Sequence, residues 1–250
     1  MINKDLHTHS YFCDGKNSPE EMVLAAIEKG LKTIGVVVHS YTQKDSSYCV
    51  KKENVKVFQA EMARLKVKYA DKIEVLCGVE QDCSSTFSTE GFDYVIGSVH
   101  YFEVEGKLYN VDYGREQLKC VVDEVFGGDY YAAVENYFER VKALADKFKL
   151  DIIGHFDLIC KFNKDGALFD ENHPRFINAF NDALDKLIPL NVPFEINTGA
   201  IARGYQDKPY PLLSVYNAIK ARGGKFVISS DSHNKDNVAF EYGKWKFMLD

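Results

Sequence analysis

The chain of 250 residues lacks several features that mark common classes of protein. No apolar run approaches the length needed to cross a bilayer, so we expect no membrane partner. No block of lysine and arginine stands out and the net charge is −6, which argues against a nucleic-acid partner. The few residues before Asp5 leave no room for a signal peptide, so we predict a cytoplasmic protein.

The sequence also lacks internal repeats, low-complexity segments and any CxxC pair among its six cysteines. Without a secretory signal, we interpret the cysteines as reduced thiols, mostly in the core. Cys13 and Cys83 lie near candidate metal ligands in the sequence. A ligand role for either one stays open, but a small buried hydrophobe is the favoured interpretation.

What the chain does have is a regular alternation of short apolar segments and amphipathic segments. The apolar fraction of 46% is ordinary for a globular protein. Seven predicted strands, most of them separated by helices, favour an α/β fold with a mainly parallel sheet closed into a barrel, as one domain over residues 1–250. The predicted strands span residues 2–7, 33–38, 73–79, 94–99, 151–154, 193–196 and 225–228.

Three amphipathic stripes predict helices that pack on the core. Ser18 followed by Pro19 and two acids is a typical helix start, and Lys29-Gly30 ends that helix. Apolar residues at spacings of three and four predict helices over residues 134–148 and 176–187. The insertion at 101–129 is predicted to be a loop and helix, either capping the site mouth or forming a plain surface excursion.

Six of the seven histidines follow predicted strands, one strand after another. Function gathers at the C-terminal strand ends of such barrels, so this recurrence predicts one shared site. Neutral imidazole and carboxylate together favour zinc, iron or manganese. Nine groups are too many for one ion and about enough for two or three metals, and such clusters hydrolyse phosphate esters. The candidate ligands are His7, His9, Asp14, His39, Glu80, His100, His155, Asp231 and His233.

The candidate ligands lie in the motifs Asp5-Leu6-His7-Thr8-His9-Ser10, His39, Gly78-Val79-Glu80, Gly97-Ser98-Val99-His100, Gly154-His155 and Ser230-Asp231-Ser232-His233. As an ordered set, these motifs resemble those of the PHP superfamily, named for polymerase and histidinol phosphatase. The resemblance runs from Asp5 to about Gly243 and is greatest to the monofunctional histidinol phosphatases. It implies a distorted (β/α)7 barrel and the hydrolysis of L-histidinol phosphate, a step of histidine biosynthesis.

The resemblance further implies how three metals would share the ligands. One metal would take His7, His9, Glu80 and Asp231, and a second would add His100 and His155 to a bridging Glu80. The third would use His39, His233 and Asp14; the Asp14-Gly15 pair is also a common turn. Relatives usually carry an acid before the equivalent of His39, whereas this chain has Val38, so occupancy by only two metals stays open.

The predicted reaction is attack on phosphorus by a metal-activated hydroxide. Glu80, Asp231 and His233 are the catalytic candidates, with Asp231 or His233 giving the leaving alkoxide its proton. Arg203, in a segment that resembles the phosphate-binding segment of the family, is the first predicted phosphate contact and Lys161 the second, although a surface position is also open for Lys161.

Further side chains are assigned to the substrate or to the support of the ligands. Asp5 either orients a ligand imidazole or is a simple acid at a strand start. Glu195 and Asn197 are expected to bind the amine or imidazole of the substrate. Tyr101, Phe102 and Tyr205 are expected to wall its pocket, and His173 to lie at the surface.

Three other functions compete with this interpretation. The same chemistry could act on another small phosphate ester, a nucleotide or a nucleic-acid end. An amidohydrolase-like metal hydrolase also opens with HxH, but that class usually bridges its metals with a modified lysine, where this chain has Glu80. A barrel that keeps metals only for stability or regulation would not need so complete a ligand set.

Overall fold

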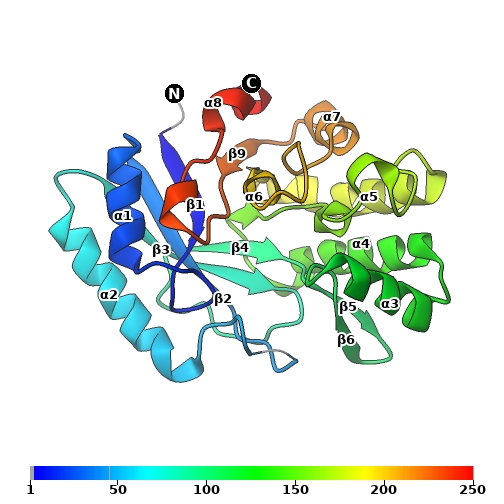
Figure 1. Ribbon diagram of the computed structural model, residues 1–250, viewed down its shortest axis with the longest axis horizontal. Helices are drawn as coiled ribbons and strands as arrows, with labels where there is room; N and C mark the ends of the chain where they lie inside the picture. Colours follow the sequence, from blue (N-terminus) through cyan, green and yellow to red (C-terminus); the bar gives the residue numbers. More distant parts are fainter. Residues whose placement is uncertain (1–2, 45, 250) are drawn as a thin grey trace.

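The structure is a computed structural model that describes residues 3–44 and 46–249. Its main sheet has seven strands in the order β1-β2-β3-β4-β7-β8-β9, and every neighbouring pair is parallel. This arrangement confirms the predicted α/β fold and all seven strand positions (Figure 1). The strands are β1 (Lys4–His9), β2 (Thr33–His39), β3 (Glu74–Asp82), β4 (Tyr94–Ser98), β7 (Ile152–Ile153), β8 (Phe194–Asn197) and β9 (Phe226–Ser229).

The sheet curves into a nearly closed barrel. The backbone N–H of His9 donates to the carbonyl of Ser232 at 2.7 Å, and the Ser232 N–H donates to the carbonyl of His7 at 3.2 Å. The segment after β9 therefore pairs with the end of β1. The first strand runs two residues beyond its predicted end and includes His9, whereas its predicted start, Ile2, lies outside the described residues.

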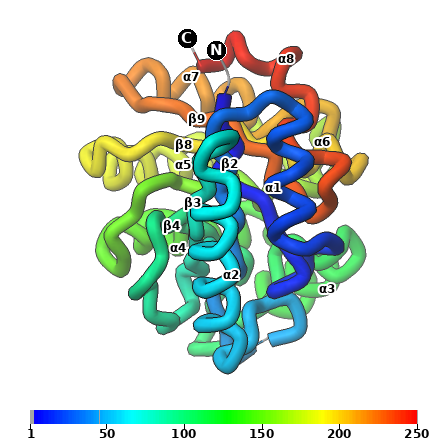
Figure 2. The backbone as a smooth tube through the Cα atoms, turned by 90° about the vertical axis from the view of Figure 1, so that its left-hand side faces the viewer, coloured from blue at the N-terminus to red at the C-terminus, as the bar shows by residue number. Residues whose placement is uncertain are grey.

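The helices cover the outside of this barrel. Figure 2, viewed from their side, shows α1 and α2 lying over the first three strands. Ser18 is the predicted N-cap of α1, and it also forms a capping box with Glu21: its hydroxyl accepts from the Glu21 N–H, and the Glu21 carboxylate accepts from the Ser18 N–H. The helices are α1 (Pro19–Glu28), α2 (Val55–Lys68), α3 (Arg115–Phe126), α4 (Tyr130–Lys147), α5 (Pro174–Leu187), α6 (Gly199–Ala202), α7 (Leu213–Ala221) and α8 (Tyr242–Trp245).

Short 3-10 turns join these elements, at Lys52–Asn54, Leu158–Cys160, Lys164–Gly166, Ile188–Leu190, Lys235–Asn237 and Lys246–Leu249. Within the described part of the chain, none of the helices has the length and apolar content that a bilayer span requires.

Tyr94 fills the barrel interior below the strand ends. Its hydroxyl donates to the carbonyl of Leu6 at 2.5 Å, and its ring lies against Gly35 and Gly78. A Cβ atom on either glycine would come within 2.3 Å of Tyr94 atoms, so only glycine fits at both positions. This ring packs the lower barrel and leaves the polar side chains at the upper end.

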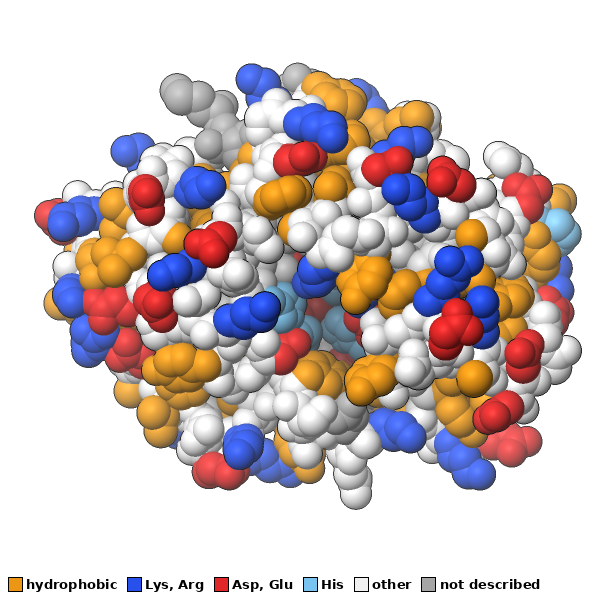
Figure 3. Space-filling model, viewed as in Figure 1, with side chains coloured by type: hydrophobic (Ala, Val, Ile, Leu, Met, Phe, Trp, Pro, Cys, Tyr) orange, Lys and Arg blue, Asp and Glu red, His pale blue; other side chains and the backbone are white. Residues whose placement is uncertain are grey.

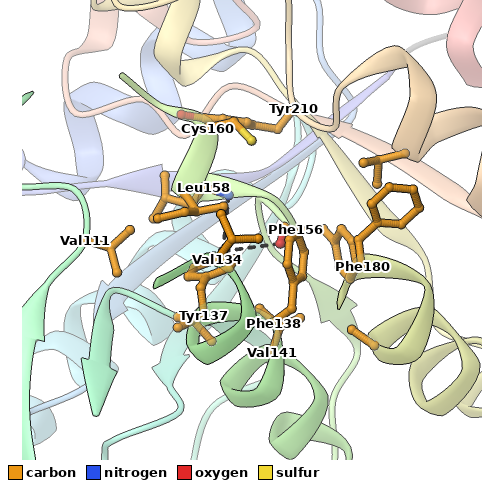
Figure 4. Close-up of a cluster of buried hydrophobic side chains, with 14 of the residues drawn as sticks. Val111, Val134, Tyr137, Phe138, Val141, Phe156, Leu158, Cys160, Phe180 and Tyr210 are labelled. Carbon is orange, nitrogen blue, oxygen red and sulfur yellow. Dashed lines mark hydrogen bonds between the residues drawn. The ribbon is translucent and has the colours of Figure 1, made fainter. Parts of the chain in front are cut away.

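The larger part of the core lies between β4, β7, β8 and the helices α4 and α5 (Figure 4). Phe138 and Val141 of α4 and Phe180 of α5 face Phe156 there, as the two amphipathic stripes predict. The buried Tyr137 hydroxyl donates to the carbonyl of Phe156 at 3.2 Å and accepts from the Leu158 N–H at 3.1 Å. The segment directly after His155 is thereby fixed to α4.

The long insertion after β4 contains an antiparallel hairpin that the sequence patterns did not predict. Its strands β5 (Tyr101–Val104) and β6 (Lys107–Asn110) precede helix α3. The residues that follow β6 reach the cavity at the strand ends. The insertion therefore caps the site mouth, and the alternative of a plain surface excursion is wrong.

Candidate metal centre

A cavity of about 360 Å³ opens where the carboxyl ends of the strands meet. In the space-filling view it is a hollow near the middle of the face, with histidine side chains at its floor (Figure 3). Its lining includes seven of the nine predicted ligands, from the strand ends and the loops behind them: Asp14, His39, Glu80, His100, His155, Asp231 and His233.

Glu80 lies at the centre of the cluster. Its Oε1 is 2.8 Å from His155 Nε2 and 3.3 Å from His100 Nε2. Its Oε2 is 3.2 Å from His7 Nε2 and 2.8 Å from His39 Nδ1. One carboxylate thus reaches imidazoles from four different strands or strand ends, the geometry expected of a bridging ligand.

All nine predicted ligands fall into four overlapping groups whose donor atoms lie within 4.8 Å of one another. No described cysteine joins any of these groups. The groups overlap at His7, His9, His39 and Glu80, and they place His100 and His155 in different groups, whereas the resemblance implies one metal for both. The groups are His7, His9 and Asp231; His7, Glu80 and His155; His39, Glu80 and His100; and His9, Asp14, His39 and His233.

Asp14 reaches the cluster from the loop after β1. Its Oδ2 lies 3.2 Å from His233 Nε2, and its Oδ1 lies 3.5 Å from His39 Nε2. Its pKa is lowered below the ordinary value because His39 and His233 outweigh the opposite effect of burial. The loop therefore carries a ligand-like carboxylate as well as the Asp14-Gly15 turn.

The imidazoles and carboxylates of the cluster shift one another's pKa values. Burial alone would raise the pKa of Glu80, but His39 and His7 hold it well below its ordinary value. Burial, followed by the positive charge of His233 and His39, lowers the pKa of His9 to about 3. Burial opposes a charge on His7, His39 and His100, but Glu80 and the neighbouring acids raise their pKa values, so bound cations would have to displace these protons to reach neutral imidazole.

Orphaned polar atoms provide a test of the fit to metal ions. His7 Nε2, His9 Nε2 and Glu80 Oε2 are fully buried and form no hydrogen bond with the described residues. Leaving such atoms unpaired is costly in a folded protein. Glu80 Oε2 lies 3.2 Å from His7 Nε2 and 3.4 Å from His9 Nε2, so shared cations would satisfy all three atoms. The donor set therefore fits a multinuclear centre.

Two carboxylates support metal-binding histidines from behind, a role that the sequence analysis did not assign to them. Glu195 Oε1 lies 2.7 Å from His7 Nδ1, and Asp82 Oδ2 lies 3.1 Å from His100 Nδ1. Carboxylates in this position fix the ring orientation of a metal-binding histidine. The position of Asp82 could have been predicted from the sequence, because it lies two residues after Glu80 in β3 and so on the same face of the strand.

The predicted substrate contact by Glu195 and Asn197 is wrong. Both side chains are completely buried. Glu195 also accepts from the His155 N–H at 2.9 Å and from Asn197 Nδ2 at 3.0 Å, and Asn197 Oδ1 accepts from the Gly199 N–H at 2.9 Å. No oxygen of either residue faces the cavity, because both residues support the strand ends.

The structure also decides the roles of Asp5 and Val38. Asp5 accepts from the backbone and hydroxyl of Ser230 at 3.1 and 2.5 Å, and from the Ala239 N–H at 3.0 Å. It therefore holds the segment before Asp231, and among the described residues it makes no hydrogen bond to an imidazole ring. Val38 is fully buried in the outer cluster under α1 and α2. It points away from His39 across the strand, so it lies outside the centre.

Arg203 and Lys161 supply positive charge to the cavity wall. Arg203 Nη2 lies 2.9 Å from Asp231 Oδ2, and Nη1 lies 3.2 Å from His233 Nδ1. Lys161 is only 7% exposed, so the surface alternative for it is wrong. Its Nζ donates to the carboxylate of Asp112 at 3.0 Å and to the carbonyl of Asp112 at 2.9 Å.

The remaining predicted residues divide between the cavity and the core. Tyr101 and Tyr205 line the cavity, but Phe102 is wholly buried in the hydrophobic core, so its predicted pocket role is wrong. The Cys83 thiol donates to the carbonyl of Arg140 at 3.2 Å, away from the centre. His173 caps α5 and stacks on a tyrosine far from the cluster.

A parallel barrel with imidazoles and carboxylates gathered at its strand ends is the architecture of barrel-type metal-dependent hydrolases. The sequence model of one such family, the PHP domain, matches residues 5–199. This chain belongs to the PHP domain family, as its motifs indicate.

Comparisons with individual proteins agree with this assignment. A Deinococcus radiodurans protein, provisionally named histidinol-phosphatase, is 29% identical over 95% of this chain and 89% of its own length. A Listeria monocytogenes structure, provisionally described as the histidinol phosphatase HisK, superposes with a TM-score of 0.83 at 22% identity over 97% of this chain and all of its own. The Lactococcus lactis histidinol phosphate phosphatase, solved with zinc, L-histidinol and phosphate, superposes with a TM-score of 0.76. It is 21% identical, and the match covers 99% of this chain and 92% of its own.

Proposed function

We propose that this chain is a metal-dependent phosphomonoesterase that hydrolyses L-histidinol phosphate to L-histidinol and phosphate, as a single PHP-type domain in the cytoplasm. The observation that carries the proposal is the position of Arg203 and Lys161 on the wall of the cavity whose floor holds the Glu80 cluster. A phosphoryl group bound there would meet cationic side chains on one side and the metal ligands on the other. The names of the similar proteins support the choice of substrate.

The nine ligands would hold two or three divalent metals, and the nitrogen-rich set suits zinc, iron or manganese. Zinc is present in the L. lactis complex. Such ions would activate water as the nucleophile and neutralise charge on the phosphoryl oxygens. Glu80 would be shared between ions, because its Oε1 faces two imidazoles and its Oε2 faces three others.

The chain's own side chains would bind and orient the phosphate. The planar Arg203 guanidinium can grip two phosphoryl oxygens, whereas Lys161 contributes a point charge. We assign proton transfer to Asp231 rather than His233, because Nδ1 and Nε2 of His233 already face Arg203 and Asp14. A phosphate bound by Arg203 would compete for the guanidinium that holds Asp231 Oδ2 at 2.9 Å, and that oxygen would then carry a proton to the leaving oxygen.

The deciding experiment is a measurement of phosphate release from a panel of phosphomonoesters with metal-reconstituted protein. We expect the highest kcat/KM with L-histidinol phosphate. Activity confined to nucleotides would overturn the choice of substrate and leave the phosphoesterase chemistry standing. Absence of phosphate release from every ester, with metal bound, would overturn the proposed function.

A further inference from the structure

The cavity lining contains one acid that the metal centre does not use. Four carboxylates line the cavity, and Asp14, Glu80 and Asp231 all belong to the ligand groups. The fourth, Asp112, is in none of these groups. It comes from the loop between β6 and α3, so the capping insertion brings it to the mouth.

The Asp112 carboxylate can accept a further hydrogen-bond donor. Its Oδ2 lies 3.0 Å from Lys161 Nζ, and its side chain is 26% exposed. Its Oδ1 makes no hydrogen bond with the described residues. An ionised carboxylate can accept about four hydrogen bonds, so the pair with Lys161 leaves most of this capacity unused.

The arrangement of Asp112 and Lys161 suits a zwitterion. In L-histidinol phosphate the phosphate ester and the ammonium group sit on adjacent carbons, so opposite charges lie close together. Lys161 and Asp112 place a cation and an anion equally close on the cavity wall. The two dipoles match when the phosphate faces Lys161 and the ammonium faces Asp112.

The neighbouring wall is suited to the rest of such a molecule. Aromatic rings of Tyr48, Tyr101, Tyr113 and Tyr205 line the same cavity. Faces of tyrosine rings attract cations and stack on flat heterocycles. The wall around Asp112 therefore offers contacts for a cationic and aromatic leaving group.

We propose that Asp112 binds the ammonium group of the leaving alcohol and makes the enzyme selective for phosphate esters of 2-amino alcohols. This inference rests on the proposed phosphatase function and adds a residue that determines its specificity. Asp112 takes the role that sequence reasoning gave to Glu195 and Asn197, which the fold buries beneath the centre.

The test compares kcat/KM for L-histidinol phosphate with that for 3-(imidazol-4-yl)propyl phosphate, which lacks only the amine. In Asp112→Asn we expect the ratio of the two values to fall at least about tenfold, the size of one hydrogen bond to a charged group. Asp112→Glu keeps the charge and should restore much of the ratio. Glu116→Gln removes a charge from the exposed start of α3, outside the cavity, and should leave the ratio unchanged.

A Lys161→Met variant separates substrate recognition from mere support of the lysine. It should lower kcat/KM for both esters and change their ratio less than about threefold. If Asp112→Asn also lowers both values equally, Asp112 only positions Lys161 and the proposal is wrong. Calorimetry on metal-free protein gives a second readout. There Asp112→Asn should weaken the binding of L-histidinol at least about tenfold and should change the binding of 3-(imidazol-4-yl)propanol little.

Failure of the proposed function would look different. In that case the wild type would favour neither imidazole ester over the other phosphomonoesters of the panel. The same ratio measured with O-phosphoethanolamine and ethyl phosphate would then decide the role of Asp112. A ratio that Asp112→Asn leaves unchanged in both pairs of esters would overturn the proposal.

Discussion

Glu195 and His7 are joined by a buried hydrogen bond of 2.7 Å, although 188 positions separate them in the sequence. Strands β8 and β1 carry these residues, and the contact forms only because the barrel nearly closes. It leaves the other ring nitrogen of His7 pointing at Glu80, 3.2 Å away. The support of the centre is thus built from the far end of the chain.

Replacement of this supporting carboxylate tests its importance. We expect Glu195→Gln to weaken zinc binding by roughly 10- to 100-fold, because His7 loses the partner that fixes its ring. Competition with a chelator measures the affinity. Glu74→Gln, at the exposed start of β3, is the control. Equal zinc affinity in wild type and Glu195→Gln would refute the supporting role.

A second prediction separates histidines of the cluster from the one outside it. His100→Ala should abolish phosphate release and lower the metal content measured by elemental analysis, since it removes a donor beside Glu80. His173→Ala should retain both and lose only about 1 kcal/mol of stability, because His173 is a helix cap. Full metal content and turnover in His100→Ala would exclude it from the centre.

Arg203→Ala should raise KM for the phosphate ester at least about tenfold, since a charged hydrogen-bonding partner of the phosphate is lost. Metal content should stay unchanged, because Arg203 offers no lone pair to a cation. Steady-state kinetics and elemental analysis test both statements, with the exposed Arg222→Ala as the control. Loss of metal would show that Arg203 mainly positions Asp231.

The packing of Tyr94 predicts a coupled effect on stability. Gly35→Ala would place a Cβ 2.0 Å from the Tyr94 hydroxyl oxygen, and overpacking of this kind costs about 1–3 kcal/mol. The double variant with Tyr94→Phe should be less destabilised than the sum of the two single variants. Thermal unfolding measures these differences. Gly243→Ala meets no neighbour and should be nearly neutral, whereas strict additivity would contradict the contact.

Acid should remove the stabilising effect of Glu20, which joins α1 to α2. Hydrogen bonds from Lys68, Tyr69 and Arg64 lower its pKa from 4.5 to about 2. Its contribution is therefore full above pH 4.5 and is lost as the pH falls through about 2. Glu20→Gln should lower the Tm of metal-free protein slightly at pH 7 and progressively less toward pH 2. A constant difference across this range would contradict the shifted pKa.

The strand positions could be predicted because each strand is a short apolar run bounded by turn residues, as at residues 33–38 and 225–228. The nine candidate ligands could be predicted because parallel strands bring their carboxyl ends to one edge. The hairpin after His100 could not, because its strands are short and only partly buried, so they carry little alternation of apolar and polar residues.

By itself the sequence determined the order of strands and helices, and it placed histidines and acids after successive strands. Only the tertiary structure decided which acids support imidazoles and which face the substrate. Glu195, Asp112 and Asp82 are all carboxylates near strand ends or loops, and local sequence does not record burial. The closure of the barrel buried Glu195 and Asp82 behind the centre and left Asp112 open to the cavity.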